Sequence, residues 1–264
     1  MSMDDVRHQM PASAGRVAER RGEASSKPTS DETSSPRHET INAGQGLLAQ
    51  VLARENMQRA WKRVKANKGA AGVDGMDIAQ TGRYLVTALP TIRKQLMAGT
   101  YRPSPVRRVG IPKPDGSERE LGIPTVTDRL IQQALLQVLQ PLIDPTFSEH
   151  RYGFRPGRRA RDAVLAAQQH VQDGFRVVVD VDLEKFFDRV NHDVLIDRLQ
   201  KRIADASIIG LIRSYLNAGI MSNGVVAERE AGTPQGGPLR RLSTDLSRDL
   251  KLLALNLPAE SVPD

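Results

Sequence analysis

Apolar residues recur at helical spacing in several separate stretches of this chain, but not in its first 44 residues. Residues 1–44 contain no aromatic residue and no Leu, and they mix Ser, Pro, Arg and Glu. Such a composition cannot bury enough apolar surface to offset the entropy lost on ordering. We therefore expect a disordered leader over residues 1–44.

The first helical pattern covers residues 47–67 and ends in the glycine-rich loop NKGAAGVDG. Trp61 falls on the apolar face of this pattern, which favours a core anchor over a ligand platform. A second, shorter helix is expected after Pro90, and Gly99 is expected to end it.

A longer apolar stripe follows Thr125 and Asp128, which are spaced like a capping pair, and it lasts until Pro141. The same periodicity predicts three later helices, near residues 161–171, 192–203 and 207–218.

Two regions have the pattern of extended chain. Residues 105–124 read as two extended runs joined by a turn at residues 114–116, which predicts a basic hairpin. Residues 175–181 are mostly apolar and predict a buried strand, whose period of two places Val178, Asp180 and Asp182 on one face.

Charge adds a preference for polyanions. The 264 residues are 39% hydrophobic and 26% charged, and their formal net charge is +7. Lys and Arg side chains that bind phosphates release condensed counterions, so a basic protein associates readily with nucleic acid. Ordinary solubility charge is the alternative interpretation.

Several function classes are excluded or disfavoured. The chain has no Cys, so disulfides and thiolate zinc sites are excluded, and its five His residues show no ligand spacing. No stretch approaches the roughly 20 apolar residues of a membrane span, and the N-terminus has no apolar signal core. We expect a cytoplasmic protein.

The loop SEHRYGFRPGRRARDAV gathers five Arg residues around two aromatic rings. Guanidinium groups hold phosphates and rings stack on bases, so this composition suits a nucleic-acid strand. A solvated loop with two buried rings is the other interpretation. The candidate binding residues are Arg151, Tyr152, Arg155, Arg158 and Arg159.

Taken in order, five motifs resemble the reverse transcriptases encoded by group II introns, which are maturase-type RNA-directed DNA polymerases. They are NKGAAGVDG, the run YRPSPVRRVGIPKPDGSERELGIPTVTDRLIQQAL, the loop RYGFRPGRRARDAV, the segment DLEKFFDRVNHDVL, and GTPQGGPL. Each motif is weak by itself, but five in the family's order are specific. The resemblance implies RNA template or intron RNA, DNA primer and deoxynucleotides as partners.

The resemblance also implies a metal site. Asp182 matches the family's catalytic carboxylate, which holds Mg²⁺, and the backbone carbonyl of Leu183 would face the same metal. Asp180, on the same strand face, is the second candidate. Phe187 matches the ring that lies beneath the incoming sugar and excludes a ribose 2′-hydroxyl.

Nucleotide and template contacts are implied at two further motifs. Lys113 and Arg119 match the cations that grip the incoming triphosphate, although without the family they would be solvated hairpin charges. Gln235 matches the glutamine that contacts the nucleotide. Gly236 and its neighbour Gly237 would let the backbone approach the template and primer closely.

The chain departs from the family after GTPQGGPL. The family continues to a hairpin carrying Tyr-Ala-Asp-Asp, whereas residues 240–264 read RRLSTDLSRDLKLLALNLPAESVPD. Two-metal catalysis needs carboxylates from a second element, so we expect the 264-residue chain to be inactive by itself.

The expected fold class is α+β, with right-hand polymerase fingers and an incomplete palm, and with helices packed on a small, mostly antiparallel sheet. The domains are a leader (1–44), fingers (45–174), a partial palm (175–239) and a divergent tail (240–264) that forms an amphipathic helix. Two alternatives are a non-catalytic, maturase-like remnant that grips intron RNA, and a product that does not fold stably. Oligomeric state is not indicated.

Overall fold

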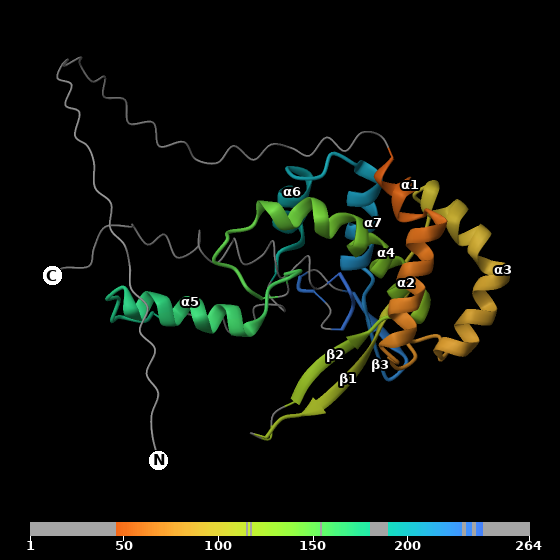
Figure 1. Cartoon of the computed structure of the whole chain (residues 1–264). Helices are drawn as coiled ribbons and strands as arrows, with labels where there is room; N and C mark the ends of the chain where they lie inside the picture. The colour runs from red at the N-terminus through yellow and green to blue at the C-terminus, as the bar shows by residue number, and fades with distance from the viewer. Residues whose placement is uncertain are drawn as a thin grey trace, which may run out of the picture. The chain divides into compact units, whose positions relative to one another are not determined.

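The computed structural model describes residues 46–114, 116, 118–153, 155–179, 190–228, 231–233 and 236–239 (Figure 1). All of them lie within one unit of the chain, His38–Asp264. The predicted leader and tail lie outside the described residues.

The helix expected over residues 47–67 is instead two helices, α1 (Leu47–Val51) and α2 (Arg54–Ala66). The break is stable because side chains satisfy the carbonyls that the interrupted helix leaves unpaired. Asn56 Nδ2 donates to the carbonyl of Val51 at 2.9 Å, and Arg93 donates to the carbonyl of Leu52. Trp61 packs against the core as a partly buried side chain, as predicted.

The helix expected after Pro90 begins far earlier, at Ile78, and forms the 20-residue helix α3 (Ile78–Met97). A capping box starts it: Asp77 accepts from the backbone N–H of Gln80 at 2.7 Å, and Gln80 accepts from that of Asp77 at 2.9 Å. Pro90 lies inside the helix, so its missing N–H did not end the element. The predicted stop is correct, because Gly99 adopts a positive φ of 67° directly after the helix.

Helix α4 (Val126–Ile143) is the centre of the core. Its N-cap is Thr125, which accepts from the backbone N–H of Asp128 at 3.0 Å, as the capping pair predicted. The helix extends past Pro141 and leads into the short 3-10 helix η1 (Asp144–Thr146). Twelve of its 18 residues are buried, because α1, α2 and α3 all pack against it.

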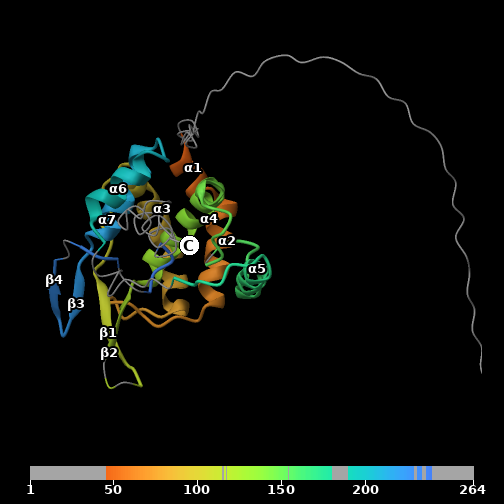
Figure 2. The ribbon, with the colours of Figure 1, turned by 90° about the vertical axis from the view of Figure 1, so that its left-hand side faces the viewer.

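The predicted hairpin is present as β1 (Val106–Pro112) and β2 (Glu118–Ile123), which pair antiparallel. Gly116 takes a φ of +80° in the turn, and its N–H donates to the carbonyl of Lys113 at 3.1 Å. The sheet order is β2-β1-β3-β4, with β3 (Ile220–Ser222) parallel to β1 and β4 (Val225–Ala227) antiparallel to β3. Figure 2 shows this short pair beside β1.

Three more helices follow the sequence prediction: α5 (Ala160–Gln172), α6 (His192–Gln200) and α7 (Ala206–Leu216). The strand expected over residues 175–181 is wrong for the part that the structure describes. Residues 175–179 have no strand structure, and Val177, Val178 and Val179 are 75–85% exposed. An apolar run becomes a buried strand only where neighbouring strands pair with it, and none of the four described strands does so.

Helices and a four-stranded, mostly antiparallel sheet confirm the α+β fold class. Within the described part of the chain, every helix is too short or too polar to cross a membrane.

Candidate functional site

Four segments from elsewhere in the sequence meet at residues 122–129, which join β2 to α4; we call these residues the junction. The glycine-rich loop of residues 67–75 is the first. Arg129 Nη2 donates to the carbonyl of Ala70 at 2.7 Å, and Arg107 donates twice to the carbonyl of Ala71, at 3.1 and 2.8 Å. A Cβ at Gly72 would lie 2.6 Å from the backbone of Thr125. Glycine is therefore required where the loop contacts the junction.

Asp128 is a buried acid within the junction and is 1% exposed. Its carboxylate accepts hydrogen bonds from the hydroxyls of Tyr101 at 2.8 Å, Tyr215 at 3.3 Å and Thr125 at 2.7 Å, and from the backbone N–H of Ser104 at 3.2 Å. Burial raises the pKa of Asp128, and these hydrogen bonds lower it in part. The acid thus ties the start of α4 to the segment before β1 and to α7.

The loop GTPQGGPL also reaches the junction. A Cβ at Gly236 would lie 2.5 Å from the carbonyl oxygen of Gly122, and one at Gly237 would lie 2.4 Å from Oε1 of Gln132. Leu239 belongs to the buried core. Close packing within the protein therefore accounts for both glycines, and an approach of Gly236 to template and primer stays a prediction.

The two predicted triphosphate-binding cations lie at the far end of the hairpin. Burial along β1 and β2 decreases from the junction toward the turn, and both Lys113 and Arg119 are exposed. Between the two strands, Arg108 of β1 forms an ion pair with Glu120 of β2. The hairpin therefore carries Lys113 and Arg119 away from the core, where a phosphate could reach them.

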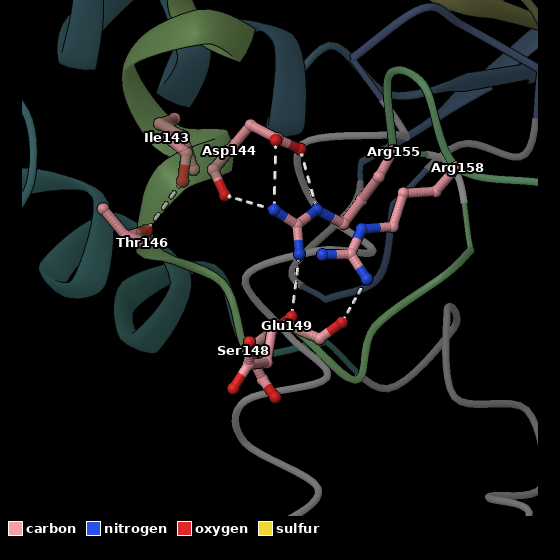
Figure 3. Close-up of polar contacts among 7 residues, drawn as sticks. All are labelled: Ile143, Asp144, Thr146, Ser148, Glu149, Arg155 and Arg158. Carbon is pink, nitrogen blue, oxygen red and sulfur yellow. Dashed lines mark hydrogen bonds and ion pairs between the residues drawn. The ribbon is translucent and has the colours of Figure 1, made fainter. Parts of the chain in front are cut away.

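We call the loop SEHRYGFRPGRRARDAV the arginine loop. Its Arg155 points toward Asp144 (Figure 3). Its Nε lies 3.0 Å from Oδ1 of Asp144 and its Nη2 lies 3.1 Å from Oδ2, and Nη1 donates to the carbonyl of Ser148 at 2.7 Å. The side chain is only 8% exposed. This forked ion pair shapes the loop, so Arg155 serves the protein itself in this arrangement.

The other arginines of the loop lie on aromatic rings or in solvent. The guanidinium of Arg151 lies 4.4 Å from the centroid of the Phe147 ring, and that of Arg158 lies 5.2 Å from the Tyr152 ring. Arg158 also donates to the carbonyl of Glu149, and Arg159 is exposed. The sequence interpretation overlooked Phe147, whose ring is 8% exposed and also faces Arg155 and Arg202.

The residues implied to form the reaction centre fall elsewhere. Asp180, Asp182, Leu183, Phe187 and Gln235 lie outside the described residues. Within the described ranges, no group of three or more His, Asp or Glu residues could hold a metal ion.

Sequence analysis also missed a basic groove between α2 and α4, with a volume of about 670 Å³. Arg59, Lys62 and Arg63 line its α2 side, and Gln137 and Gln140 line its α4 side. The three cations are exposed, and Lys62 and Arg63 follow Arg59 by three and four positions, so helical periodicity applied to charge would have found them.

Comparison with known proteins identifies the central part of the chain. A family model described as "Reverse transcriptase (RNA-dependent DNA polymerase)" matches residues 111–240. Protein YkfC of Escherichia coli (strain K12) is 34% identical over 208 residues, which cover 76% of this chain and 55% of YkfC. Group II intron-encoded protein LtrA of Lactococcus lactis subsp. cremoris is 35% identical over 188 residues, which cover 71% of this chain and 31% of LtrA.

A solved structure shares the fold. A chain of the "Partial Cas6-RT-Cas1--Cas2 complex" matches with a TM-score of 0.54 and 23% identity, over 78% of this chain and 34% of that chain. The chain thus spans about half of YkfC and a third of LtrA and of the structural match.

Proposed function

Because the chain belongs to the reverse transcriptase family and is homologous to proteins encoded by group II introns, we propose that it forms the fingers and part of the palm of an RNA-directed DNA polymerase. In this proposal residues 45–174 are the fingers and residues 175–239 belong to the palm. RNA template or intron RNA, DNA primer and deoxynucleotides are its partners.

The observation that carries the proposal is the junction itself. The glycine-rich loop and the loop GTPQGGPL both contact residues 122–129, which begin at the end of the hairpin strand β2. Three of the five motifs that carry the family resemblance are therefore joined in space: NKGAAGVDG, the run that contains the hairpin, and GTPQGGPL.

Nucleotide binding is assigned to residues of three motifs. Lys113 and Arg119 bind the triphosphate from the exposed hairpin, and Gln235 contacts the nucleotide from the palm loop. Phe187 lies beneath the sugar and excludes a 2′-hydroxyl. The arginine loop holds the nucleic-acid strand, and Arg159 is one of its exposed cations.

The family uses a divalent metal, and we assign Mg²⁺ to Asp182 and the carbonyl of Leu183. A carboxylate and a carbonyl oxygen are ligands that Mg²⁺ prefers. When bound, the metal would neutralise charge on substrate phosphates. Further carboxylates must complete the site, so these 264 residues by themselves should bind substrates without extending a primer.

A ternary-complex assay tests this function. The protein is bound to an RNA template paired with a DNA primer, and dissociation of the duplex is timed with matched and mismatched deoxynucleotides. We expect the matched nucleotide to slow dissociation, and Lys113→Ala with Arg119→Ala to abolish that effect while duplex binding persists. No difference between matched and mismatched nucleotides would contradict the proposal.

Primer extension is the companion measurement. We expect no incorporation by the 264 residues in Mg²⁺. Incorporation that disappears in Asp182→Ala would assign catalysis to Asp182 and would disprove the need for further carboxylates.

A second candidate function, RNA binding without polymerisation, is favoured by the groove between α2 and α4. Three exposed cations beside glutamine side chains suit a phosphate backbone. Lys62→Glu with Arg63→Glu should weaken RNA binding and reduce its salt dependence, whereas Lys94→Glu, an exposed change on α3, should have little effect. Equal effects would contradict a role for the groove.

A further inference from the structure

His192 is a buried histidine that connects three segments of the palm. It is the first residue of α6 and is 6% exposed. Its Nε2 lies 2.7 Å from the carbonyl oxygen of Gly232, the first residue of GTPQGGPL, and its Nδ1 lies 3.2 Å from Oδ1 of Asn217, the C-cap of α7.

The backbone around Gly232 is held from both sides. The N–H of Gly232 donates to the carbonyl of Val190 at 2.8 Å, and Asn191 forms an antiparallel bridge with Ala231. Gly232 itself has a φ of +84°, which favours glycine. Because His192 binds the carbonyl of Gly232, both the N–H and the carbonyl of Gly232 have hydrogen-bond partners.

The chemistry of the ring determines its orientation. A carbonyl oxygen only accepts, so Nε2 must carry the proton that it donates to Gly232. In the neutral ring Nδ1 is then an acceptor and requires the Asn217 amide to present its N–H₂ group, whereas the charged ring donates to Oδ1. Rotation of one amide therefore lets the ring hold Gly232 in either charge state.

We propose that His192 is a positioning residue that sets the loop GTPQGGPL for nucleotide binding by Gln235. The loop is anchored at Gly232 by His192 and at Gly236 by its close contact with Gly122. Gln235 lies between these anchors in sequence. Val190 and His192 both belong to the motif DLEKFFDRVNHDVL, which also carries Asp182. Their hydrogen bonds to Gly232 therefore join this motif to GTPQGGPL. The part of the proposal that concerns Gln235 rests on the proposed function.

Two substitutions separate the hydrogen bond from the packing. A Gln at position 192 can place an amide nitrogen near the position of Nε2 and keep the bond to Gly232, whereas an Asn places it near Nδ1 and loses that bond. His150→Asn is the control, because His150 is an exposed histidine in another loop.

The first measurement is hydrogen exchange in the free protein, which requires no nucleotide. Loss of one buried hydrogen bond costs on the order of 1.4 kcal/mol, so His192→Asn should speed exchange of peptides covering residues 231–239 about tenfold. His192→Gln should restore slow exchange, and peptides from α2 and α4 should not change. Unchanged exchange of residues 231–239 in His192→Asn overturns the proposal, as does equal loss of protection throughout the chain in both variants.

The second measurement is the matched-nucleotide effect on duplex dissociation. His192→Asn should require a several-fold higher nucleotide concentration, with duplex binding unchanged and with rescue in His192→Gln. If wild-type protein shows no nucleotide effect, the proposed function fails while the exchange result still decides the anchoring role. If the nucleotide effect is present but the same in all variants, the positioning role is wrong.

Discussion

The hydroxyl of Tyr101 donates a hydrogen bond of 2.8 Å to Oδ1 of Asp128, across 27 positions of sequence. The hydroxyl of Tyr215 in α7 donates to the same oxygen at 3.3 Å. Burial and the nearby Asp128 raise the pKa of both tyrosines, so both hydroxyls remain protonated donors. One carboxylate thus fixes three segments around the start of α4.

Removing this carboxylate should strongly destabilise the protein. Asp128→Ala would leave the buried hydroxyls of Tyr101 and Tyr215 without their acceptor, at a cost of about 2–4 kcal/mol in the free energy of unfolding. Urea denaturation followed by circular dichroism measures it. Asp193→Ala is the control, since that acid also lies in a first helical turn but its side chain is 81% exposed. A loss for Asp128→Ala no larger than that for Asp193→Ala would contradict this role.

The same acid makes stability depend on pH. The pKa of Asp128 is raised in the folded protein, mainly by burial, so the folded state binds a proton more readily than the unfolded state. The free energy of unfolding contributed by this group therefore increases as the pH falls through the folded-state pKa toward the ordinary value of 3.8. Relative to Asp128→Asn, the wild-type protein should gain stability between neutral pH and about pH 4. Parallel stability curves for the two proteins would exclude this linkage.

The arginines of the arginine loop should fall into two groups, one that stabilises the loop and one that binds RNA. Arg155→Lys keeps the charge but cannot form the forked pair with Asp144, so we expect faster proteolysis within residues 148–159 and a loss of about 1–3 kcal/mol in stability. Arg159→Ala changes an exposed side chain, and it should weaken RNA binding with an unchanged melting temperature. The opposite pattern would mean that Arg155 is the phosphate ligand.

The contact between Gly236 and Gly122 can be tested with alanine. Gly236→Ala would place a Cβ 2.5 Å from a backbone oxygen, which forces the loop away from the junction. We expect faster hydrogen exchange in residues 231–239 and a loss of about 2 kcal/mol or more. Gly236 also has a positive φ, of +155°. Gly224→Ala separates strain from contact, because Gly224 has a φ of +81° but no atom within 4 Å of such a Cβ; it should cost only about 1 kcal/mol. Equal losses would show that backbone strain alone matters at Gly236.

Much of the local structure was predictable from spacing. The capping pair Thr125 and Asp128 predicted the start of α4, and the turn at residues 114–116 predicted the hairpin. These features depend on neighbours within a few positions, which the chain order records directly. The predictions failed where distant side chains intervene, as at Leu52, whose carbonyl is satisfied by Arg93.

The reaction centre and the roles of the glycines also depend on contacts between distant parts of the chain. Asp182, Phe187 and Gln235 could be named only through ordered motifs, and their roles stay predictions. Gly236 was recognisable as a glycine that allows close approach, but the backbone that it approaches is Gly122 of the protein itself, and the contact of Gly72 with Thr125 was not predicted. No local pattern encodes which backbone will lie opposite a glycine.

By itself the sequence determined the family, the basic charge, the positions of most helices and the N-cap of α4, because those depend on residue order and short-range periodicity. Only the tertiary structure decided that Asp128, Arg155 and His192 have their polar groups directed toward other parts of the protein. Each of these side chains is paired with groups from other segments, and burial makes such pairing necessary because an unpaired polar group away from water is costly.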